Sequence, residues 1–316
     1  MPLSPDAQAS LNARARQQIR QLGLSEHYPF EPHFISTPQG AMHYLDEGHG
    51  SPVLMLHGNP TWSFLYRRLV KPVSIQHRAI VPDHIGFGLS DKPSNEKDYS
   101  IERHIDNLET LLLELDLTDV TLVMQDWGGP IGLGAAARHP DRIARLMILN
   151  TFGFYPPAIG MDPDNLKLPP PLLLMRSRGV GDFLVRRLGF FDNVVMKLAT
   201  ANSKGLKAVH HAYRQVFQNA AERAGVMAFP RLIPTTSSHP VAQLLLNETG
   251  PFLDRFEGPV DIVWGLKDPL FPVAALEAWK QRLPQAHVTE LGNAKHYLQE
   301  DAPDIVIERL LDLLRR

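Results

Sequence analysis

The most informative stretch of the sequence runs from Val120 to Gly134. An apolar run, Val120–Met124, is followed by Asp126 and then by a helix-like segment rich in small residues. A sharp turn between a strand and a helix can push one side chain above the edge of a sheet. Small residues allow the helix to approach the strand closely at such a turn, and this segment has Gly128, Gly129, Gly132 and Gly134. A carboxylate at such a tip is anionic at neutral pH and is an oxygen nucleophile. The segment therefore predicts a nucleophile at Asp126, although an aspartate before a helix could also serve as its N-cap.

The turn does not match the strict serine-hydrolase pattern. Met124 stands where that pattern has a glycine, and the tip residue is an aspartate. Three further segments place reactive groups after predicted strands: Asn59 lies where a loop N–H would help to form an oxyanion hole, and Asp268 and His296 follow later strands. The order of nucleophile, acid and histidine at 126, 268 and 296 is that of the α/β hydrolases.

The elements that would position these residues alternate between strands and helices. Two runs, His33–Ser36 and Ala41–Leu45, flank a turn and predict a hairpin. Continuous apolar runs typical of strands buried on both faces follow at Val53–Leu56, Ala79–Val81, Val120–Met124, Leu146–Leu149, Val260–Trp264 and Val288–Leu291. Amphipathic helices are predicted over Tyr99–Leu117, with Ser100 as N-cap, and over Asp304–Leu314. This alternation predicts an α/β fold with a mostly parallel central sheet flanked by helices.

Strand-like runs stop between residues 152 and 253, where prolines separate apolar and basic segments of helical spacing. We expect a helical cap domain there, inserted into a core domain made of residues 1–151 and 254–316. Residues 151–250 hold eleven Lys and Arg against six Asp and Glu, a net charge of +5, so the rest of the chain, whose total is −2, carries −7. Such an insertion would lie over Asp126, exclude water and shape a substrate cavity.

Composition narrows the classes of function. The chain of 316 residues is 44% hydrophobic and 21% charged, which is typical of a globular protein. Its weakly negative total charge gives no reason to expect binding to nucleic acid or to acidic membrane surfaces. The sequence has no cysteine, which excludes disulfides, thiolate metal sites and a cysteine nucleophile.

No cofactor, metal or membrane span is expected. The glycine fingerprints of nucleotide-binding loops are absent, and His210, His211 and the other histidines lack the spacing of a metal site. The N-terminal 30 residues are too polar for a secretory signal, and no apolar run approaches the roughly 18 residues of a spanning helix. We therefore expect a cytoplasmic protein whose partners are small molecules.

Four segments resemble a known family, and the resemblance covers most of residues 28–305. They are HGNPTWSFLYRRLV at 57–70, VPDHIGFGLSDKP at 81–93, QDWGG at 125–129 and NAKHYLQED at 293–301. The sequence resembles the haloalkane dehalogenases, in the branch that also contains the β-lactone decarboxylases of bacterial olefin biosynthesis. The implied reaction hydrolyses a carbon–halogen bond to an alcohol, a halide ion and a proton through a covalent aspartyl-alkyl ester, without a cofactor.

The resemblance also implies roles for single residues. Asp126 matches the nucleophile, His296 the base and Asp268 the acid of the family. One branch carries its acid about where Asn150 stands, and because an asparagine cannot supply that charge, Asp268 is favoured.

The resemblance assigns the halide site to Asn59 and Trp127. Their side-chain N–H groups would hold the departing halide, and their backbone N–H groups would form the oxyanion hole. Neutral donors suit this role because they stabilise a growing anion without quenching the neighbouring carboxylate, as a cation would.

Three other functions stay open. A β-lactone decarboxylase would use the same aspartate to open a cis-disubstituted β-lactone, releasing carbon dioxide and a long-chain alkene, and the basic, apolar insertion would suit a lipid-derived substrate or a multi-enzyme assembly. An epoxide hydrolase would need tyrosines of the insertion, for which Tyr155 and Tyr213 are the candidates. A non-catalytic protein of the same fold would only hold a ligand. Assembly as a homo-oligomer is compatible with each of these.

Overall fold

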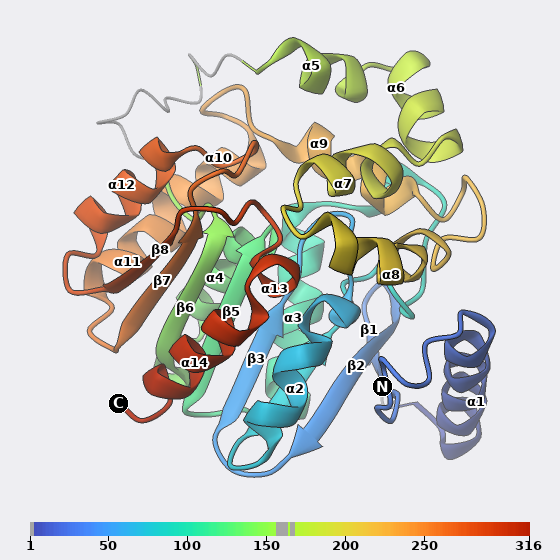
Figure 1. The fold of residues 1–316 in the computed structure, drawn as a ribbon, viewed down its shortest axis with the longest axis horizontal. Helices are drawn as coiled ribbons and strands as arrows, with labels where there is room; N and C mark the ends of the chain where they lie inside the picture. Colours follow the sequence, from blue (N-terminus) through green and yellow to red (C-terminus); the bar gives the residue numbers. More distant parts are fainter. Residues whose placement is uncertain (1–2, 156–163, 165–167) are drawn as a thin grey trace.

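A computed structural model describes residues 3–155, 164 and 168–316. Its described part contains one eight-stranded sheet in the order β1-β2-β4-β3-β5-β6-β7-β8, antiparallel at β1, β2 and β4 and parallel from β4 onward (Figure 1). The strands are β1 His33–Thr37, β2 Gly40–Gly48, β3 Pro52–Leu56, β4 Arg78–Pro82, β5 Val120–Asp126, β6 Ile143–Thr151, β7 Val260–Gly265 and β8 His287–Leu291. Each of them contains an apolar run that predicted it.

The two strands that precede Asn59 and Asp126, β3 and β5, lie in the middle of this sheet. Every residue of β3 and β5 is buried, as their uninterrupted apolar runs predict, whereas β8 at the sheet edge is only partly buried. The predicted hairpin is present, with Thr37 paired to Gly40 across its turn. Because β3 and β5 to β8 run parallel, their carboxyl ends meet at one edge of the sheet.

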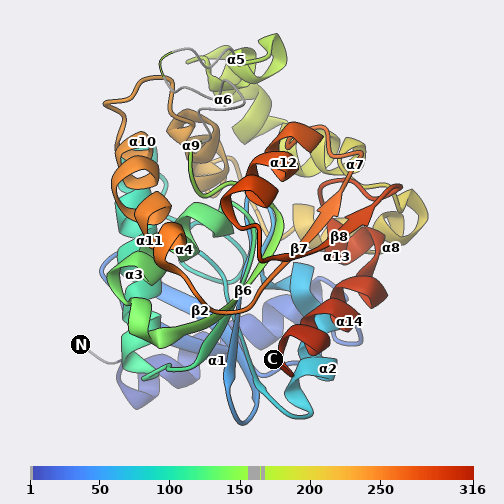
Figure 2. The same ribbon diagram turned by 90° about the vertical axis from the view of Figure 1, so that its left-hand side faces the viewer.

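Helices cover both faces of the sheet (Figures 1 and 2). α2 (Arg67–Ser74) and α14 (Pro303–Leu313) lie on one face, and α3 (Ile101–Glu114) and α4 (Gly128–Arg138) lie on the other. The predicted N-cap of α3 is confirmed, because the Ser100 hydroxyl accepts a hydrogen bond from the Arg103 N–H at 3.2 Å. Shorter elements connect these layers: α12 Val273–Arg282, α13 Leu298–Asp301 and the 3₁₀ turns η1 Ser63–Tyr66, η2 Glu96–Asp98 and η3 Pro140–Arg142.

Between β6 and β7 every element of the described residues is a helix or a helical turn. They form α5 Pro170–Arg176, α6 Val180–Asp182, α7 Met196–Leu198, α8 Ser203–Arg214, α9 Ala224–Leu232, α10 Pro240–Leu244 and α11 Gly250–Arg255, with π-helical turns at η6 Phe183–Arg187, η7 Phe191–Val195 and η8 Leu245–Thr249. α5, α6, α7 and α9 lie beyond the carboxyl ends of the parallel strands (Figure 1). α11 and η8 pack instead against α4 of the core. We call residues 152–253 the helical insertion.

The N-terminal helix α1 (Pro5–Gln21) was not predicted. Ser4 caps it by accepting a hydrogen bond from the Ala7 N–H at 3.2 Å, and it packs beside the edge strand β1. Only Ala15 and Ile19 of its residues are buried, so the helix lacks the apolar stripe that reveals a helix in a sequence. Within the described residues, no helix is long and apolar enough to cross a membrane.

Candidate active site

Asp126 ends β5 in a left-handed backbone conformation, with φ at +52°. This conformation is strained for a residue with a side chain and is typically kept where function requires it, at a cost of about 1–3 kcal/mol. The predicted glycine Gly129 makes the turn compact, because a Cβ there would lie 2.0 Å from Thr151 Oγ1. Gly58, which was not predicted, does the same on the facing loop, where a Cβ would lie 2.1 Å from Asp126 Oδ1. The Thr151 hydroxyl also donates to the Asp126 carbonyl. The surroundings therefore hold the strained turn in place.

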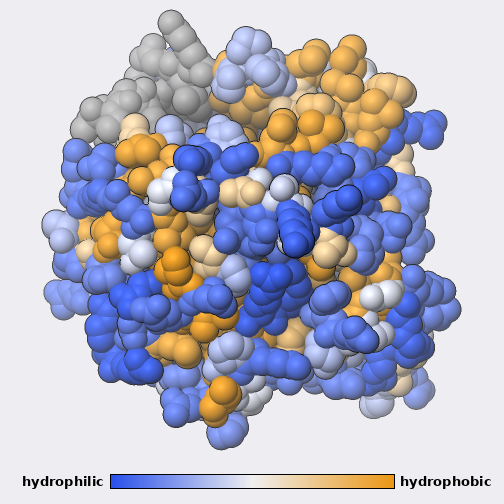
Figure 3. Space-filling view, viewed as in Figure 1, coloured by the Kyte–Doolittle hydropathy of each residue, from blue (hydrophilic) through white to orange (hydrophobic). Residues whose placement is uncertain are grey.

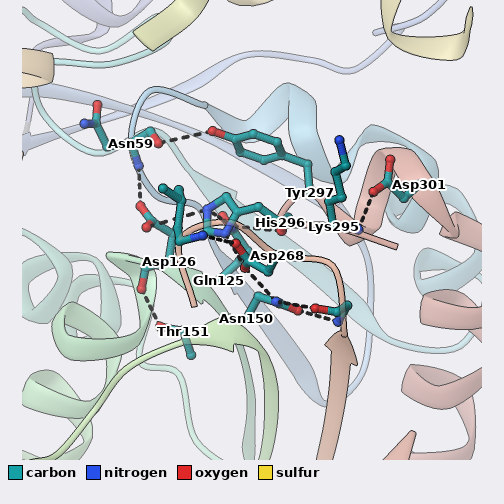
Figure 4. Close-up of polar contacts among 12 residues, drawn as sticks. Asn59, Gln125, Asp126, Asn150, Thr151, Asp268, Lys295, His296, Tyr297 and Asp301 are labelled. Carbon is teal, nitrogen blue, oxygen red and sulfur yellow. Dashed lines mark hydrogen bonds and ion pairs between the residues drawn. The ribbon is translucent and has the colours of Figure 1, made fainter. Parts of the chain in front are cut away.

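The carboxylate of Asp126 does not cap the helix that follows. Helix α4 begins at Gly128 without a side-chain cap. Asp126 Oδ1 instead accepts the Asn59 backbone N–H at 2.8 Å, across the turn from a different strand (Figure 4). The side chain is thus held above the sheet edge by the loop after β3, the place expected of an oxyanion-hole loop.

His296 lies between the two acidic side chains (Figure 4). Its Nδ1 is 2.8 Å from Asp268 Oδ2, and its Nε2 is 3.7 Å from Asp126 Oδ2. The histidine is fully buried, and both carboxylates are more than nine-tenths buried. The structure therefore brings Asp126, His296 and Asp268 together from the ends of β5, β8 and β7.

Two amides that sequence analysis gave no role complete this arrangement. Asn150 Nδ2 donates to Asp268 Oδ2 at 2.6 Å, and its Oδ1 accepts the Gly265 N–H, which fixes the amide orientation. Gln125 Nε2 lies 2.9 Å from His296 Nε2. With Nδ1–H directed at Asp268, Nε2 is the acceptor, so Gln125 and Asp268 select the same neutral tautomer of the histidine.

The pKa shifts of the pair follow from burial and charge. Burial raises the pKa of the Asp126 carboxyl above its usual value, and the charge of His296 and the backbone N–H groups of Trp127 and Asn59 offset only part of that shift. Burial would lower the pKa of His296, but the charge and hydrogen bond of Asp268 and the charge of Asp126 raise it overall. The negative charge of Asp126 is thus one of the causes that favour protonation of His296, after the charge and hydrogen bond of Asp268.

Asn59 and Trp127 flank the carboxylate with neutral donors. Asn59 Nδ2 donates one hydrogen to the Val226 carbonyl at 3.2 Å, and its second amide hydrogen has no acceptor in the part of the chain that the structure describes. The Trp127 ring packs against Phe152 and Phe229, with centroids 5.1 and 4.9 Å away. Its indole N–H has no hydrogen-bond partner among the described residues. Each of these two side chains thus has an N–H hydrogen without a hydrogen-bond partner in the described part of the chain.

Of the two tyrosines that epoxide opening would require, one hydroxyl is hydrogen-bonded to another side chain and the other is not. The Tyr213 hydroxyl donates to Glu300, which is paired with Arg67 in a buried cluster, so Tyr213 is committed elsewhere. The Tyr155 hydroxyl is buried and has no partner in the described structure. Among the described residues, no group of three or more His, Asp or Glu side chains could hold a metal ion.

The buried sheet, the strained turn and the Asp–His–Asp arrangement define an α/β hydrolase with a carboxylate at the nucleophile position. The α/β-hydrolase fold family matches residues 51–303 of the chain. Among relatives, a cis-3-alkyl-4-alkyloxetan-2-one decarboxylase of Shewanella oneidensis is 40% identical over 285 residues, 89% of this chain and 87% of the relative. A haloalkane dehalogenase of Mycolicibacterium paratuberculosis is 36% identical over 299 residues, 90% of this chain and 93% of the relative.

Solved structures agree with these relatives. A mutant of haloalkane dehalogenase DatA from Agrobacterium tumefaciens superposes with a TM-score of 0.80 at 25% identity, covering 92% of this chain and 99% of that chain. A tetrameric haloalkane dehalogenase, DpaA from Paraglaciecola agarilytica, gives a TM-score of 0.76 at 25% identity, covering 93% and 96%. The chain belongs to the haloalkane dehalogenase family, which here includes relatives named as decarboxylases of an oxetan-2-one, that is, a β-lactone. The resemblance stated from the sequence is confirmed.

Proposed function

We propose that this protein is a haloalkane dehalogenase that hydrolyses carbon–halogen bonds through a covalent ester on Asp126. The observation that carries the proposal is a carboxylate at the strained turn, one oxygen held by the Asn59 N–H at 2.8 Å and the other facing His296 Nε2 at 3.7 Å. A serine in this place would need the histidine to remove its proton before attack, whereas an ionised carboxylate does not.

In the first step Asp126 Oδ2 attacks the carbon that bears the halogen. The new carbon–oxygen bond forms as the carbon–halogen bond breaks, and the halide leaves with the bonding electrons. The free N–H donors of Asn59 and Trp127 stabilise the halide as its charge grows. The step leaves an alkyl ester on Asp126 and consumes no water.

In the second step His296 removes a proton from water, which attacks the ester carbonyl carbon. Charge develops on Oδ1, which already accepts the Asn59 backbone N–H, and the Trp127 backbone N–H also bonds to this carboxylate. Formation of the ester removes the charge of Asp126, one of the causes that raise the pKa of His296, so more of the histidine is in the neutral form that can accept a proton from water. The products are the alcohol, the halide and a proton, and Asp126 is regenerated.

The remaining features of the proposal concern the surroundings of the site. Residues 152–253 act as a cap domain on a core of residues 1–151 and 254–316, and the cap keeps water from the small, hydrophobic substrate. The enzyme acts in the cytoplasm and uses no metal or organic cofactor. A homo-oligomer is supported by the tetrameric neighbour, and a multi-enzyme assembly stays open.

A second candidate is decarboxylation of a β-lactone, favoured by the 40% identity to a relative named for that activity. Asp126 would attack the saturated ring carbon bonded to the ring oxygen, and the bond between that carbon and the ring oxygen would break to give a free carboxylate. Loss of carbon dioxide would then form the alkene and release Asp126. This route releases no halide and consumes no water, so the halide donors are unnecessary for it.

Substitution of the halide donors tests the choice between the two reactions. Removal of one preorganised donor from a developing anion costs about 10²–10³ in rate, so Asn59→Ala and Trp127→Phe should each lose that much bromoalkane turnover. Halide release from 1-bromobutane is measured beside alkene formation from a long-chain cis-β-lactone. Wild-type halide release by both variants would contradict a halide site at this place. Variants that form alkene normally but lose halide release would make dehalogenation the side activity.

A further inference from the structure

The outer face of the helical insertion carries apolar side chains that are exposed to solvent. Leu173 and Leu174 of α5, Val180 of α6, Phe183 of η6 and Leu188 after it are each 49–55% exposed. α5, α6 and η6 are in contact, so these side chains share one region, seen in orange over α5 and α6 in Figure 3. We call these five residues the apolar face. A cluster of this kind on a soluble domain marks an interaction surface.

The exposed charged side chains of residues 168–200 are all basic. Arg178 and Arg187 are exposed within the apolar face. The nearby Asp182 is only partly exposed and is paired with Arg231 at 3.1 Å, and Asp192 is buried. No Asp or Glu from 168 to 200 is exposed.

The whole chain has the same asymmetry, since residues 151–250 carry +5 and the rest −7. The negative total charge conceals this division, which is why it gave no reason to expect an acidic membrane surface as a partner.

We propose that the apolar face docks the protein on an anionic lipid bilayer, with the apolar side chains in the interface and the arginines against lipid headgroups. Amphipathic helices with aromatic and aliphatic residues on one side and basic residues beside them bind bilayers in this way. A pair of copies joined face to face would oppose their arginines, whereas a bilayer satisfies both kinds of side chain. The negative remainder of the protein is repelled, which turns the insertion towards the lipid.

The test is flotation of the full-length protein with vesicles. With vesicles of equal phosphatidylglycerol and phosphatidylcholine we expect binding that weakens as salt is raised, and little binding to pure phosphatidylcholine. Leu174→Ser with Phe183→Ser, and separately Arg178→Glu with Arg187→Glu, should reduce binding about tenfold or more. Ile75→Ser is the matched control, because Ile75 is 74% exposed on the core and lies outside the face.

Two outcomes would overturn the proposal. One is that the wild type does not float with the vesicles, or that the double variants float as well as the wild type. The other is self-association of the wild type, measured by light scattering, that Phe183→Ser abolishes without any vesicle binding, which would make the face a contact between copies. Thermal melts of each variant show whether the fold is kept.

A second inference concerns how the catalytic histidine is held, and it rests on the proposed function. His296 and the residue before it, Lys295, are hydrogen-bonded to the helical insertion. The His296 N–H donates to the Ala199 carbonyl at 3.0 Å, and Lys295 Nζ donates to the Leu198 carbonyl at 2.7 Å. The base is therefore anchored to residues at the end of α7 as well as to the core.

Asp301 joins the same two segments through both carboxylate oxygens. Oδ1 accepts the N–H groups of Ala201 and Asn202 at 2.8 and 2.9 Å. Oδ2 accepts the N–H of Lys295 at 2.8 Å, the contact drawn in Figure 4. An oxygen acceptor is needed on both sides, since all three partners are donors. An aspartate meets this requirement, and an asparagine cannot.

We infer that Asp301 is a positioning residue that couples residues 198–202 of the insertion to the histidine. Only the second step uses the histidine as a base, so loosening this link should slow ester hydrolysis and spare alkylation. Small misplacements of a catalytic group have large effects on rate, because the productive geometry is narrow.

Asp301→Asn is the informative variant, because the new amide N–H group must face one of the backbone N–H groups that Asp301 now accepts. We expect the halide burst to keep its rate within about twofold and ester hydrolysis to slow about tenfold or more. The charges of Asp268, Asp126 and Asp301 all raise the pKa of His296, so loss of the Asp301 charge should move the pH profile of hydrolysis to lower pH. Asp304→Asn removes an exposed charge three residues away and should change neither rate.

The two failures are distinguishable. If both steps slow equally and the pH profile is unmoved, Asp301 is only structural and the inference is wrong. If the wild type forms no ester, the proposed function fails, and the positioning role is then judged by ¹⁵N NMR of the His296 ring in the free enzyme. An unchanged His296 titration in Asp301→Asn would overturn the inference in that case as well.

Discussion

Asp126→Ala is expected to abolish halide release, because no other carboxylate occupies the strained turn and the oxyanion-hole N–H groups face this one. Single-turnover and steady-state release of bromide from 1-bromobutane are the measurements. Residual turnover within about tenfold of wild type, a loss of only about 1.4 kcal/mol, would show that another residue attacks.

The same variant makes a prediction about stability that separates lost chemistry from lost fold. The pKa of Asp126 is raised in the folded protein, so its ionised form destabilises the fold at any pH above the unfolded-state pKa. Asp126→Ala should therefore melt at the same or a higher temperature at pH 7. A marked fall in melting temperature would mean that the Asp126 side chain contributes to packing. The loss of activity could then reflect a damaged fold, and the His296 variant would have to identify the nucleophile.

Much of this site follows from local sequence signals. The apolar run before Asp126 and the glycines after it specify a buried strand, a sharp turn and a close-packed helix, and the structure has each of them. The order of Asp126, Asp268 and His296 then gives their relative placement, because parallel strands end at the same edge of the sheet. These signals are local, and the parallel topology of the sheet then brings the three residues to one edge.

The supporting residues carry no such signal. Gln125 and Asn150 lie in or at the end of apolar strands, and nothing in their neighbours shows that one amide reaches His296 and the other Asp268. Their roles depend on contacts between residues more than 100 positions apart in the chain. Asp301 is likewise ordinary in sequence, and its role appears only when the insertion is placed against the histidine loop.

His296→Phe is expected to separate the two steps of the reaction. Asp126 attacks without a base, so the variant should release about one halide per active site and then stop, with the ester intact. Phenylalanine keeps an aromatic ring in the stack with Phe271, whose centroid lies 5.6 Å from that of His296, so the fold should be retained. Intact-protein mass spectrometry after mixing with 1-bromobutane should show one butyl adduct, and peptide mapping should place it on Asp126.

This outcome also discriminates between chemical classes. In a serine hydrolase the loss of the histidine disables the nucleophile as well, so no burst and no adduct would form. In β-lactone decarboxylation no water is activated, so His296→Phe would keep substantial alkene formation while it traps the ester from a bromoalkane. An unmodified His296→Phe protein, or an adduct on any other residue, would exclude the covalent ester on Asp126. The adduct therefore tests the nucleophile, the independence of its attack from the base, and the need for the base in hydrolysis, all in one measurement.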